Sequence, residues 1–517
     1  MNDENIIKTQ NEGINAIVVV VKTISSRIDF LNKNITGLNS EITGLNSEIA
    51  GQRDEIVTLN SIIQELKASN VRQEIRISEL EARLNKNSNN SSKPPSQDGY
   101  GKAPKNSRQK SGRTTGGQLG HVGKTLEKVA NPDEIIELKT ETSCDCGCNL
   151  EEVENHPRTR QVFDIPEPKM WITEYVADSK VCPNCGKSHK SEFPTKVTQP
   201  TQYGKNMQAI INYLTMHQFI PLKRATEFIR DFTGQDISEG TLVNCIKTFC
   251  NTVSLSVEST KQAITQMTVV HFDESGMRTE GKTKWMHVAS TPNLTYYEVN
   301  DKRGEKATHD IGILPNFQGT AVHDHWRPYY CFTDCTHAEC NAHNLRYLKD
   351  IAENYHQQWA TEMTGLLIEV HRRVNALKKT GCVAMSMKEI NMWQNRYCHI
   401  IDKGILEDSG KSPKVLNKRG LPMKSKPLQL LYKLQQYDLE TLAFMYDFEV
   451  PFDNNLAERD IRMQKLRQKI SGCFRGANGA STFCKIRSYL STAKKNGIGA
   501  MTAIANALAG QPYIPQV

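Results

Sequence analysis

Three acidic residues stand where they could bind divalent metal ions. Asp273 follows the apolar run TVVHF and Asp324 follows TAVH, and both runs are typical of β-strands. Glu458 lies in PFDNNLAERDIRMQKLRQK, which is typical of a helix. Carboxylate oxygens are preferred ligands of Mg²⁺ and Mn²⁺. Together, the three acids could hold two such ions, about 3.5–4 Å apart, for an in-line displacement at phosphorus.

The positions of the two aspartates at strand ends suggest how they would meet. Strand carboxyl ends in an open α/β sheet converge at one edge, where ligands bind. We therefore expect Asp273 and Asp324 to lie close together, with the helix of Glu458 across the same edge. Two other acids fit less well. Glu274 would point to the other side of its strand, and Asp334 follows a weaker apolar run.

Cations accompany Glu458 along its predicted helix. Arg462 at i+4 and Lys465 at i+7 would share its face and could contact the phosphates of a nucleic acid. The same spacing also occurs in ordinary charged helices. The candidate DNA-binding residues are Arg462, Lys465, Arg467, Lys469 and Arg475.

Basic charge is concentrated in two segments. The chain of 517 residues carries a net charge of +8. Residues 86–124 hold eight Lys/Arg and one acid, and residues 459–495 hold ten and one. The remainder is therefore net acidic, and focused basic segments of this kind favour a polyanionic partner, most simply DNA.

Five of the 14 cysteines fall between Cys144 and Cys185. They form the groups CDCGC and CPNC, the second of which is a typical zinc knuckle. In a long chain without a signal peptide this pattern favours metal binding over disulfides. The N-terminus lacks a basic and an apolar region, and no run of 18 apolar residues occurs. We therefore expect a cytoplasmic protein without a membrane partner.

A second cysteine–histidine cluster has spacing that could bind zinc. It comprises Cys335, His337, Cys340 and His343. The alternative, a packed helix beside the acidic residues, is favoured.

The N-terminal region, residues 14–84, contains heptads. Isoleucine recurs every seven residues from Ile28 to Ile63. Leucine occupies the offset of an a/d seam at Leu31, Leu38, Leu45, Leu59 and Leu66. Isoleucine at a with leucine at d favours a parallel two-stranded coiled coil, and Asn70 at an a position would fix its register. We expect a homo-oligomer; a helix packed on its own protein is the alternative.

The next segments differ in composition. Residues 85–125 are rich in Ser, Asn, Pro, Gly and Lys/Arg, which predicts a basic flexible linker. Residues 130–200 hold the cysteine groups and predict a zinc-binding domain. Residues 205–255 predict helices, including a helix, a glycine turn and a second helix capped by Ser238, in the manner of a helix-turn-helix. Such helix pairs are common, so DNA binding by this region stays open.

The remaining pattern predicts a ribonuclease-H-like α/β core. Three strand-like runs, a helix and a fourth strand occupy residues 265–335, and the Glu458 helix lies in 440–495. Residues 337–440 would be a helical insertion and 496–517 a C-terminal tail. The predicted fold class is thus multidomain α+β.

Seven stretches from about residue 87 to 496 resemble bacterial transposases of the insertion sequence 66 family. They read NSNNSSKPPSQDG, GGQLGHVGK, HFDESGMRTEGKTKWMHVAST, VHDHWRPYY, HAECNAHNLRYLK, PFDNNLAERDIRMQKLRQKISGCFRG and IRSYLSTAKKNG. The resemblance implies a DDE transposase, with Asp273, Asp324 and Glu458 as the catalytic triad on two Mg²⁺ or Mn²⁺ ions. It implies cutting and joining of DNA by a cut-and-paste or copy route at the bacterial nucleoid. It also implies the coiled coil, zinc segment and helix-turn-helix, and small accessory proteins as partners.

The resemblance also suggests the structural zinc ligands. Cys144 and Cys146 precede Gly147 as in the family, so we expect them to bind Zn²⁺ with Cys182 and Cys185, with Cys148 as a possible replacement. Two other functions remain open. One is a ribonuclease-H-like nuclease or resolvase that cleaves without strand transfer, and the other is an inactive transposase-derived DNA-binding regulator.

Overall fold

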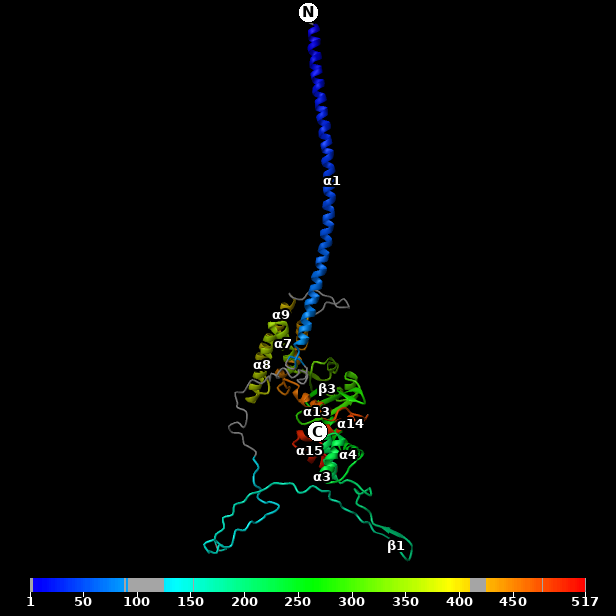
Figure 1. Cartoon of the computed structure of the whole chain (residues 1–517), viewed down its shortest axis with the longest axis vertical. Coiled ribbons are helices and arrows are strands. Elements are labelled where there is room, and N and C mark those ends of the chain that lie inside the picture. Colours follow the sequence, from blue (N-terminus) through cyan, green and yellow to red (C-terminus); the bar gives the residue numbers. More distant parts are fainter. Residues whose placement is uncertain are drawn as a thin grey trace. The chain divides into compact units, whose positions relative to one another are not determined.

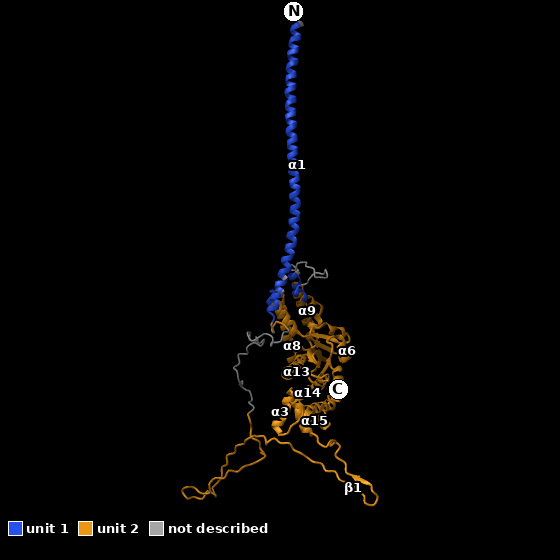
Figure 2. Cartoon of the chain, turned by 45° about the vertical axis from the view of Figure 1, so that its right-hand side comes forward, with its two compact units in different colours: residues 1–86, 353–356, 404–429 blue, residues 87–352, 357–403, 430–517 orange. Residues whose placement is uncertain are grey.

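A computed structural model describes residues 3–87, 90–91, 125–151, 153–409, 425–476 and 478–516. It divides into two compact units, which are described separately (Figure 2). The first comprises residues 1–86, 353–356 and 404–429, and the second comprises residues 87–352, 357–403 and 430–517.

The first unit is dominated by α1 (Asp3–Leu84), one uninterrupted helix of 82 residues (Figure 1). It begins eleven residues before the predicted coiled coil. No proline interrupts the segment, and the isoleucines from Ile28 to Ile63 remain 45% to 57% exposed. A lone helix in water gains little from such a seam, because most helical stability comes from packing an apolar face.

The predicted basic linker, residues 85–125, falls almost entirely outside the described residues. The cysteine segment after it has little regular structure. A hairpin of β1 (Ser179–Val181) and β2 (Ser188–Lys190) holds the CPNC group in its turn. An isolated bridge between Ser143 and Asn149 encloses the CDCGC group.

A helical region follows, made of α2 (Lys205–Asn212), the π-helix η2 (Tyr213–His217), α3 (Leu222–Thr233), α4 (Glu239–Thr252) and α5 (Ser254–Thr265). The predicted glycine turn and cap are present. Gly234 ends α3 with a left-handed φ of 71°, and the Ser238 side chain accepts a hydrogen bond from Thr241 N at the start of α4. Ile211, Ile229 and Leu242 pack in a small core between these helices.

A five-stranded mixed sheet forms the centre of the second unit. Its strands are β3 (Val269–Thr279), β4 (Lys282–Ser290), β5 (Thr295–Asn300), β6 (Thr320–His323) and β7 (Thr336–Glu339). The order is β5-β4-β3-β6-β7, in which β4 is antiparallel to β3 and β5, while β6 is parallel to β3 and β7. The helix α6 (Glu305–Ile311) and the 3₁₀ turn η3 (Leu314–Asn316) connect β5 to β6.

Two details of the sheet differ from the sequence prediction. Asp273 lies in the middle of β3, because the strand continues into a long hairpin with β4. The parallel ladder with β6 nevertheless ends at His271, two residues before Asp273. The strand β7 lies at the start of the predicted helical insertion. Its four residues are too few to show an alternating pattern.

Helices flank the sheet and extend from it. The turn η4 (Arg327–Cys331) precedes β7. Between β7 and α13 the described residues form α7 (Asn341–Tyr355), α8 (Gln358–Lys379), α9 (Met387–Ser409), α10 (Lys426–Gln436), α11 (Asp438–Thr441) and α12 (Ala443–Tyr446). The helix α13 (Asn455–Ser471) packs on β3 and β4, and α14 (Gly479–Lys495) packs on β5.

The predicted C-terminal tail contains a packed helix, α15 (Ala500–Ala509). Ala503, Ile504 and Ala507 are buried in the main core, and α15 contacts α2 and α14. The sequence GAMTAIANALAG had offered an apolar helical face that the prediction overlooked. Within the described ranges, no helix is both long and apolar enough to span a membrane.

Candidate active site

The first predicted acid, Asp273, lies on β3 among other carboxyls. Burial raises the pKa of Asp273 well above its ordinary value, and the adjacent Glu274 raises it further. The charges of Asp324 and Glu458 act in the same direction. The three predicted acids therefore lie in one electrostatic neighbourhood. The described residues form no ion pair with Asp273; its Oδ1 accepts a hydrogen bond from Glu274 N at 2.9 Å.

Asp324 follows β6, immediately beyond the parallel ladder. Its Oδ1 accepts a hydrogen bond from Trp326 N at 3.0 Å, which fixes the carboxylate in a tight turn. Burial raises the pKa of Asp324, while this hydrogen bond and the charges of Arg303 and Lys433 oppose the rise. Neither cation was predicted from the sequence. The alternative acid, Asp334, lies exposed in the loop before β7.

Glu458 occupies the first turn of α13, and its side chain is only 13% exposed. Oε2 lies 3.2 Å from Arg462 and 4.0 Å from Arg346. Oε1 is buried without a hydrogen-bond partner and lies 3.7 Å from His343 Nδ1. Two cations thus flank one oxygen of this carboxylate, while its other oxygen faces an imidazole.

The side chain of Asn454 connects α13 to β3. Its Nδ2 donates to Phe272 O at 2.7 Å, and its Oδ1 lies 2.9 Å from His271 Nδ1. Asn454 is 1% exposed and precedes the first residue of α13, while Phe272 precedes Asp273. These contacts hold the helix of Glu458 against the strand of Asp273. The sequence indicated no role for Asn454, although it lies in the PFDNN string.

Glu274 is already neutralised within the protein. Arg303 binds its Oε1 at 2.6 Å, and the Tyr329 hydroxyl donates to its Oε2. The Arg303 guanidinium lies over Trp326, 4.1 Å from the ring centre, and over Trp285 at 4.9 Å. Glu274 thus has two partners of its own, in contrast to Asp273, which has no cationic partner among the described residues.

The three predicted carboxylates have the ligand chemistry that hard divalent cations prefer. Asp273, Asp324 and Glu458 supply oxygen donors only, and Asp273 is an under-compensated buried charge that a cation would stabilise. Their oxygens do not all lie within 4.8 Å of one another.

The predicted DNA-binding residues divide into two groups. Lys465 Nζ donates to Gly276 O at 2.9 Å, and Arg467 donates to Gly472 O at 2.9 Å. The Arg467 guanidinium also stacks 3.5 Å from the ring centre of Phe474, so this side chain is used within the fold. Lys465 is nevertheless exposed, as are Arg462, Lys469 and Arg475, and Arg462 also pairs with Glu458 at 3.2 Å.

The two cysteine groups adopt similar turns. Gly186 N donates to Cys182 O and Cys182 N to Lys187 O; Gly147 N donates to Cys144 O and Cys144 N to Cys148 O. Gly147 and Gly186 have positive φ values of 82° and 69°. Cys146 precedes its glycine as Cys185 does. Hydrogen bonds from the backbone of Cys146 and of Cys185 lower the pKa of Cys144 and Cys182, respectively.

The predicted Cys335/His337/Cys340/His343 cluster is not a single site. His337 lies 2.9 Å from His323 and 3.9 Å from Cys335 Sγ. Cys340 and His343 instead approach Glu458: one donor atom from each of these three residues lies within 4.8 Å of the others. Burial, with Arg346 and Lys433, lowers the pKa of His343 to about 4, which keeps its imidazole neutral at physiological pH.

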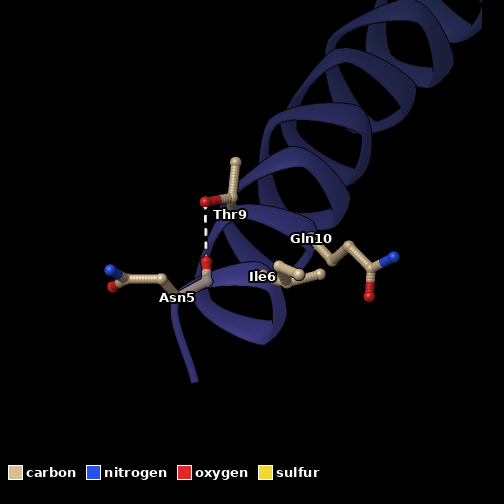
Figure 3. Close-up of a pocket in the computed structure, with 4 residues that line it drawn as sticks. All are labelled: Asn5, Ile6, Thr9 and Gln10. Atoms are coloured by element: carbon tan, nitrogen blue, oxygen red, sulfur yellow. Dashed lines mark hydrogen bonds between the residues drawn. The ribbon is translucent and has the colours of Figure 1, made fainter. Parts of the chain in front are cut away.

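A surface hollow on α1 offers no comparable chemistry. Figure 3 shows its lining residues, Asn5, Ile6, Thr9 and Gln10, which all come from adjoining turns of one exposed helix. The Thr9 hydroxyl donates to Asn5 O at 2.8 Å, an ordinary contact within a helix.

Comparison with known families agrees with an enzyme acting on DNA. The model of the transposase IS66 family matches residues 200–482, more than half of the chain. The zinc-finger binding domain of transposase IS66 matches residues 141–186, and a family of unknown function matches residues 31–127. The search of curated proteins found no match. The protein is thus a transposase with a zinc-finger domain, and it belongs to the transposase IS66 family.

Proposed function

We propose that this transposase uses Asp273, Asp324 and Glu458 as a DDE triad on two Mg²⁺ or Mn²⁺ ions. It binds the ends of its mobile element, cleaves the DNA and joins the 3′-hydroxyl ends to target DNA. The observation that carries the proposal is the buried position of Asp273 beside two further carboxylates, with no cationic partner among the described residues. Such a cluster is costly unless cations bind it.

The sheet supports a ribonuclease-H-like catalytic core. Three antiparallel strands precede two parallel ones in the order β5-β4-β3-β6-β7. In this arrangement Asp273, two residues beyond the parallel ladder of β3 with β6, and Asp324, which follows β6, would meet at the same edge of the sheet. The helix α13 would bring Glu458 to them.

The bound ions would activate the attacking water or 3′-hydroxyl and stabilise the leaving oxygen. The protein's own residues hold and balance this site. Arg303 and Lys433 oppose the accumulation of negative charge around Asp324. The exposed Arg462, Lys469 and Arg475 would contact DNA phosphates, because exposed cations bind the backbone without reading its sequence.

The other segments would organise the DNA ends. Cys144, Cys146, Cys182 and Cys185 would bind a structural Zn²⁺, and α3 with α4 would act as a helix-turn-helix. The seam of α1 would pair with a second copy, which keeps two element ends in one complex. Its isoleucines are about half-exposed in the single chain. Accessory proteins of the element remain expected partners.

The test is strand transfer in Mg²⁺ with oligonucleotides that carry the candidate element ends, taken from inverted repeats sought on either side of the gene. Asp324→Asn should bind these ends but neither cleave nor join them. Asp334→Asn is the matched control, since this nearby aspartate is exposed outside the cluster, and it should retain activity.

The two alternatives predict different results. Cleavage without joined products would indicate a nuclease or resolvase. Binding without cleavage, unchanged by Asp273→Ala, would indicate a DNA-binding regulator. Full activity of Asp324→Asn would refute the triad.

A further inference from the structure

Cys340, His343 and Glu458 form a compact group with mixed donor chemistry. One donor atom from each, a thiol sulfur, an imidazole nitrogen and a carboxylate oxygen, lies within 4.8 Å of the other two. Cys340 is 1% exposed, and the His343 and Glu458 side chains are 14% and 13% exposed. The group is therefore withdrawn from bulk solvent.

Two polar atoms of this group are left unsatisfied. His343 Nδ1 and Glu458 Oε1 are both buried without a hydrogen-bond partner. They lie 3.7 Å apart, too far for a hydrogen bond between them. Two ligands of one tetrahedral ion, each about 2.0–2.2 Å from it, are about 3.4 Å apart. The separation is thus closer to that of two ligands of a common cation than to that of a hydrogen-bonded pair.

The sulfur is also oriented by the fold. The backbone N–H of Asn454 donates to Cys340 Sγ at 3.1 Å. Cys340 immediately precedes α7, and His343 lies in the first turn of that helix, three residues on. Both side chains therefore come from one rigid element, opposite Glu458 on α13.

We infer that Cys340, His343 and Glu458 form a further metal site, which binds a borderline divalent cation of the Zn²⁺ type. Sulfur and nitrogen donors select such a cation against Mg²⁺. Three protein ligands leave a fourth position open. The ion would tether Glu458 to α7 through Oε1, and Oε2, which pairs with Arg462 at 3.2 Å in this structure, would exchange that partner for an ion of the triad. This metal site shares Glu458 with the proposed triad. It binds a different ion, however, and it is tested by metal binding rather than by strand transfer.

The test is Co²⁺ binding to the full chain in which the five cysteines of the proposed zinc domain are replaced, by Cys144→Ser, Cys146→Ser, Cys148→Ser, Cys182→Ser and Cys185→Ser, because these exposed thiols would bind Co²⁺ themselves. Excess Mg²⁺ occupies hard oxygen sites. The expected result is one equivalent of Co²⁺ with a thiolate charge-transfer band in the near ultraviolet. Adding Cys340→Ser should abolish the band.

The chain offers a matched control pair. Cys335, which directly precedes β7, and His337, within β7, are a second cysteine and histidine close together, but they lie outside the metal group. Cys335→Ser should leave the band unchanged. His343→Ala should weaken Co²⁺ binding at least about tenfold, since loss of even an outer-shell partner costs that much. If circular dichroism shows that Cys340→Ser is misfolded, the Co²⁺ affinity of His343→Ala tests the proposed metal site instead.

Three results would overturn the inference. These are absence of the band in the parent chain, its persistence in folded Cys340→Ser, and unchanged affinity in His343→Ala. Equal loss in Cys335→Ser would assign the band to another thiol and overturn it as well. None of these outcomes depends on strand transfer, so a failure here leaves the carboxylate triad to its own test.

Discussion

Replacing Asn454 with alanine should disturb both stability and activity. The substitution removes two buried hydrogen-bonding contacts, 2.7 Å to Phe272 O and 2.9 Å to His271 Nδ1. Each group left unsatisfied in the interior costs about 1–3 kcal/mol. Partial relaxation of the loop before α13 would reduce the sum, so we expect a loss of about 3 kcal/mol in the free energy of unfolding of the second unit.

The same change should displace Glu458 relative to Asp273. Misplacement by about 1 Å can cost a factor of about 10² in rate. We therefore expect Asn454→Ala to lose cleavage activity by about that factor, at temperatures and urea concentrations where it is fully folded. Urea unfolding gives the first quantity, and Mg²⁺-dependent cleavage of element ends gives the second.

The neighbouring asparagine supplies the control. Asn455 is exposed, and its side chain hydrogen-bonds to Asp453, its neighbour two residues before it, so Asn455→Ala should stay within about 0.5 kcal/mol of the wild type and remain active. The reasoning fails if Asn454→Ala is as stable and as active as Asn455→Ala. Loss of stability with full activity would show that Asn454 holds the fold but does not position Glu458.

Three further predictions follow from the site and its supports. The pKa of Asp273 is raised in the folded protein, so the folded state is favoured while this carboxyl is protonated, and that stabilisation is lost as the pH rises through the folded pKa. Asparagine cannot ionise. At neutral pH, metal-free Asp273→Asn should therefore melt at a higher temperature than the metal-free wild type. Mg²⁺ at about 100 times its Kd should stabilise the wild type by about 2.7 kcal/mol but not this variant, and the opposite order in a melting assay would contradict the assignment. Lys495→Met breaks a mostly buried ion pair with Asp460 at 2.7 Å and should cost about 3–5 kcal/mol in urea unfolding, whereas a loss below about 1 kcal/mol would refute a supporting role. Arg467→Ala should lower the melting temperature, because it removes the contact with Phe474. Lys469→Ala should weaken DNA binding and reduce the salt dependence of that binding without lowering stability. The opposite pattern, a destabilised Lys469→Ala and a stable Arg467→Ala with weak DNA binding, would refute this assignment.

Local sequence patterns predicted the mixed α+β class and the long N-terminal helix, because heptads and alternating apolar runs are local signals. Asp273 and Asp324 could be chosen because each follows such a run. Glu458 needed the family string, since an ordinary charged helix has the same spacing of acids and bases.

The contacts that support the site were not predictable in this way. Arg303 reaches Glu274 from a loop 29 residues away, and Asn454 reaches Phe272 across 182 residues. Such pairings depend on tertiary structure and produce no periodic pattern in the sequence. The cysteine–histidine cluster illustrates the same limit, since adjacent residues in the sequence point to two different neighbourhoods.

The most direct test of the carboxylate centre is cleavage of the protein by iron bound in place of Mg²⁺. Fe²⁺ with ascorbate and peroxide generates radicals that cut the backbone near the ion, and mass spectrometry locates the cuts. We expect cuts near Asp273 and Asp324 that excess Mg²⁺ suppresses and Asp324→Asn abolishes, whereas cuts near Glu458 also report the Cys340/His343/Glu458 group. Absence of cuts near Asp273 and Asp324, or cuts there that persist in Asp324→Asn and in excess Mg²⁺, would contradict the proposed carboxylate centre.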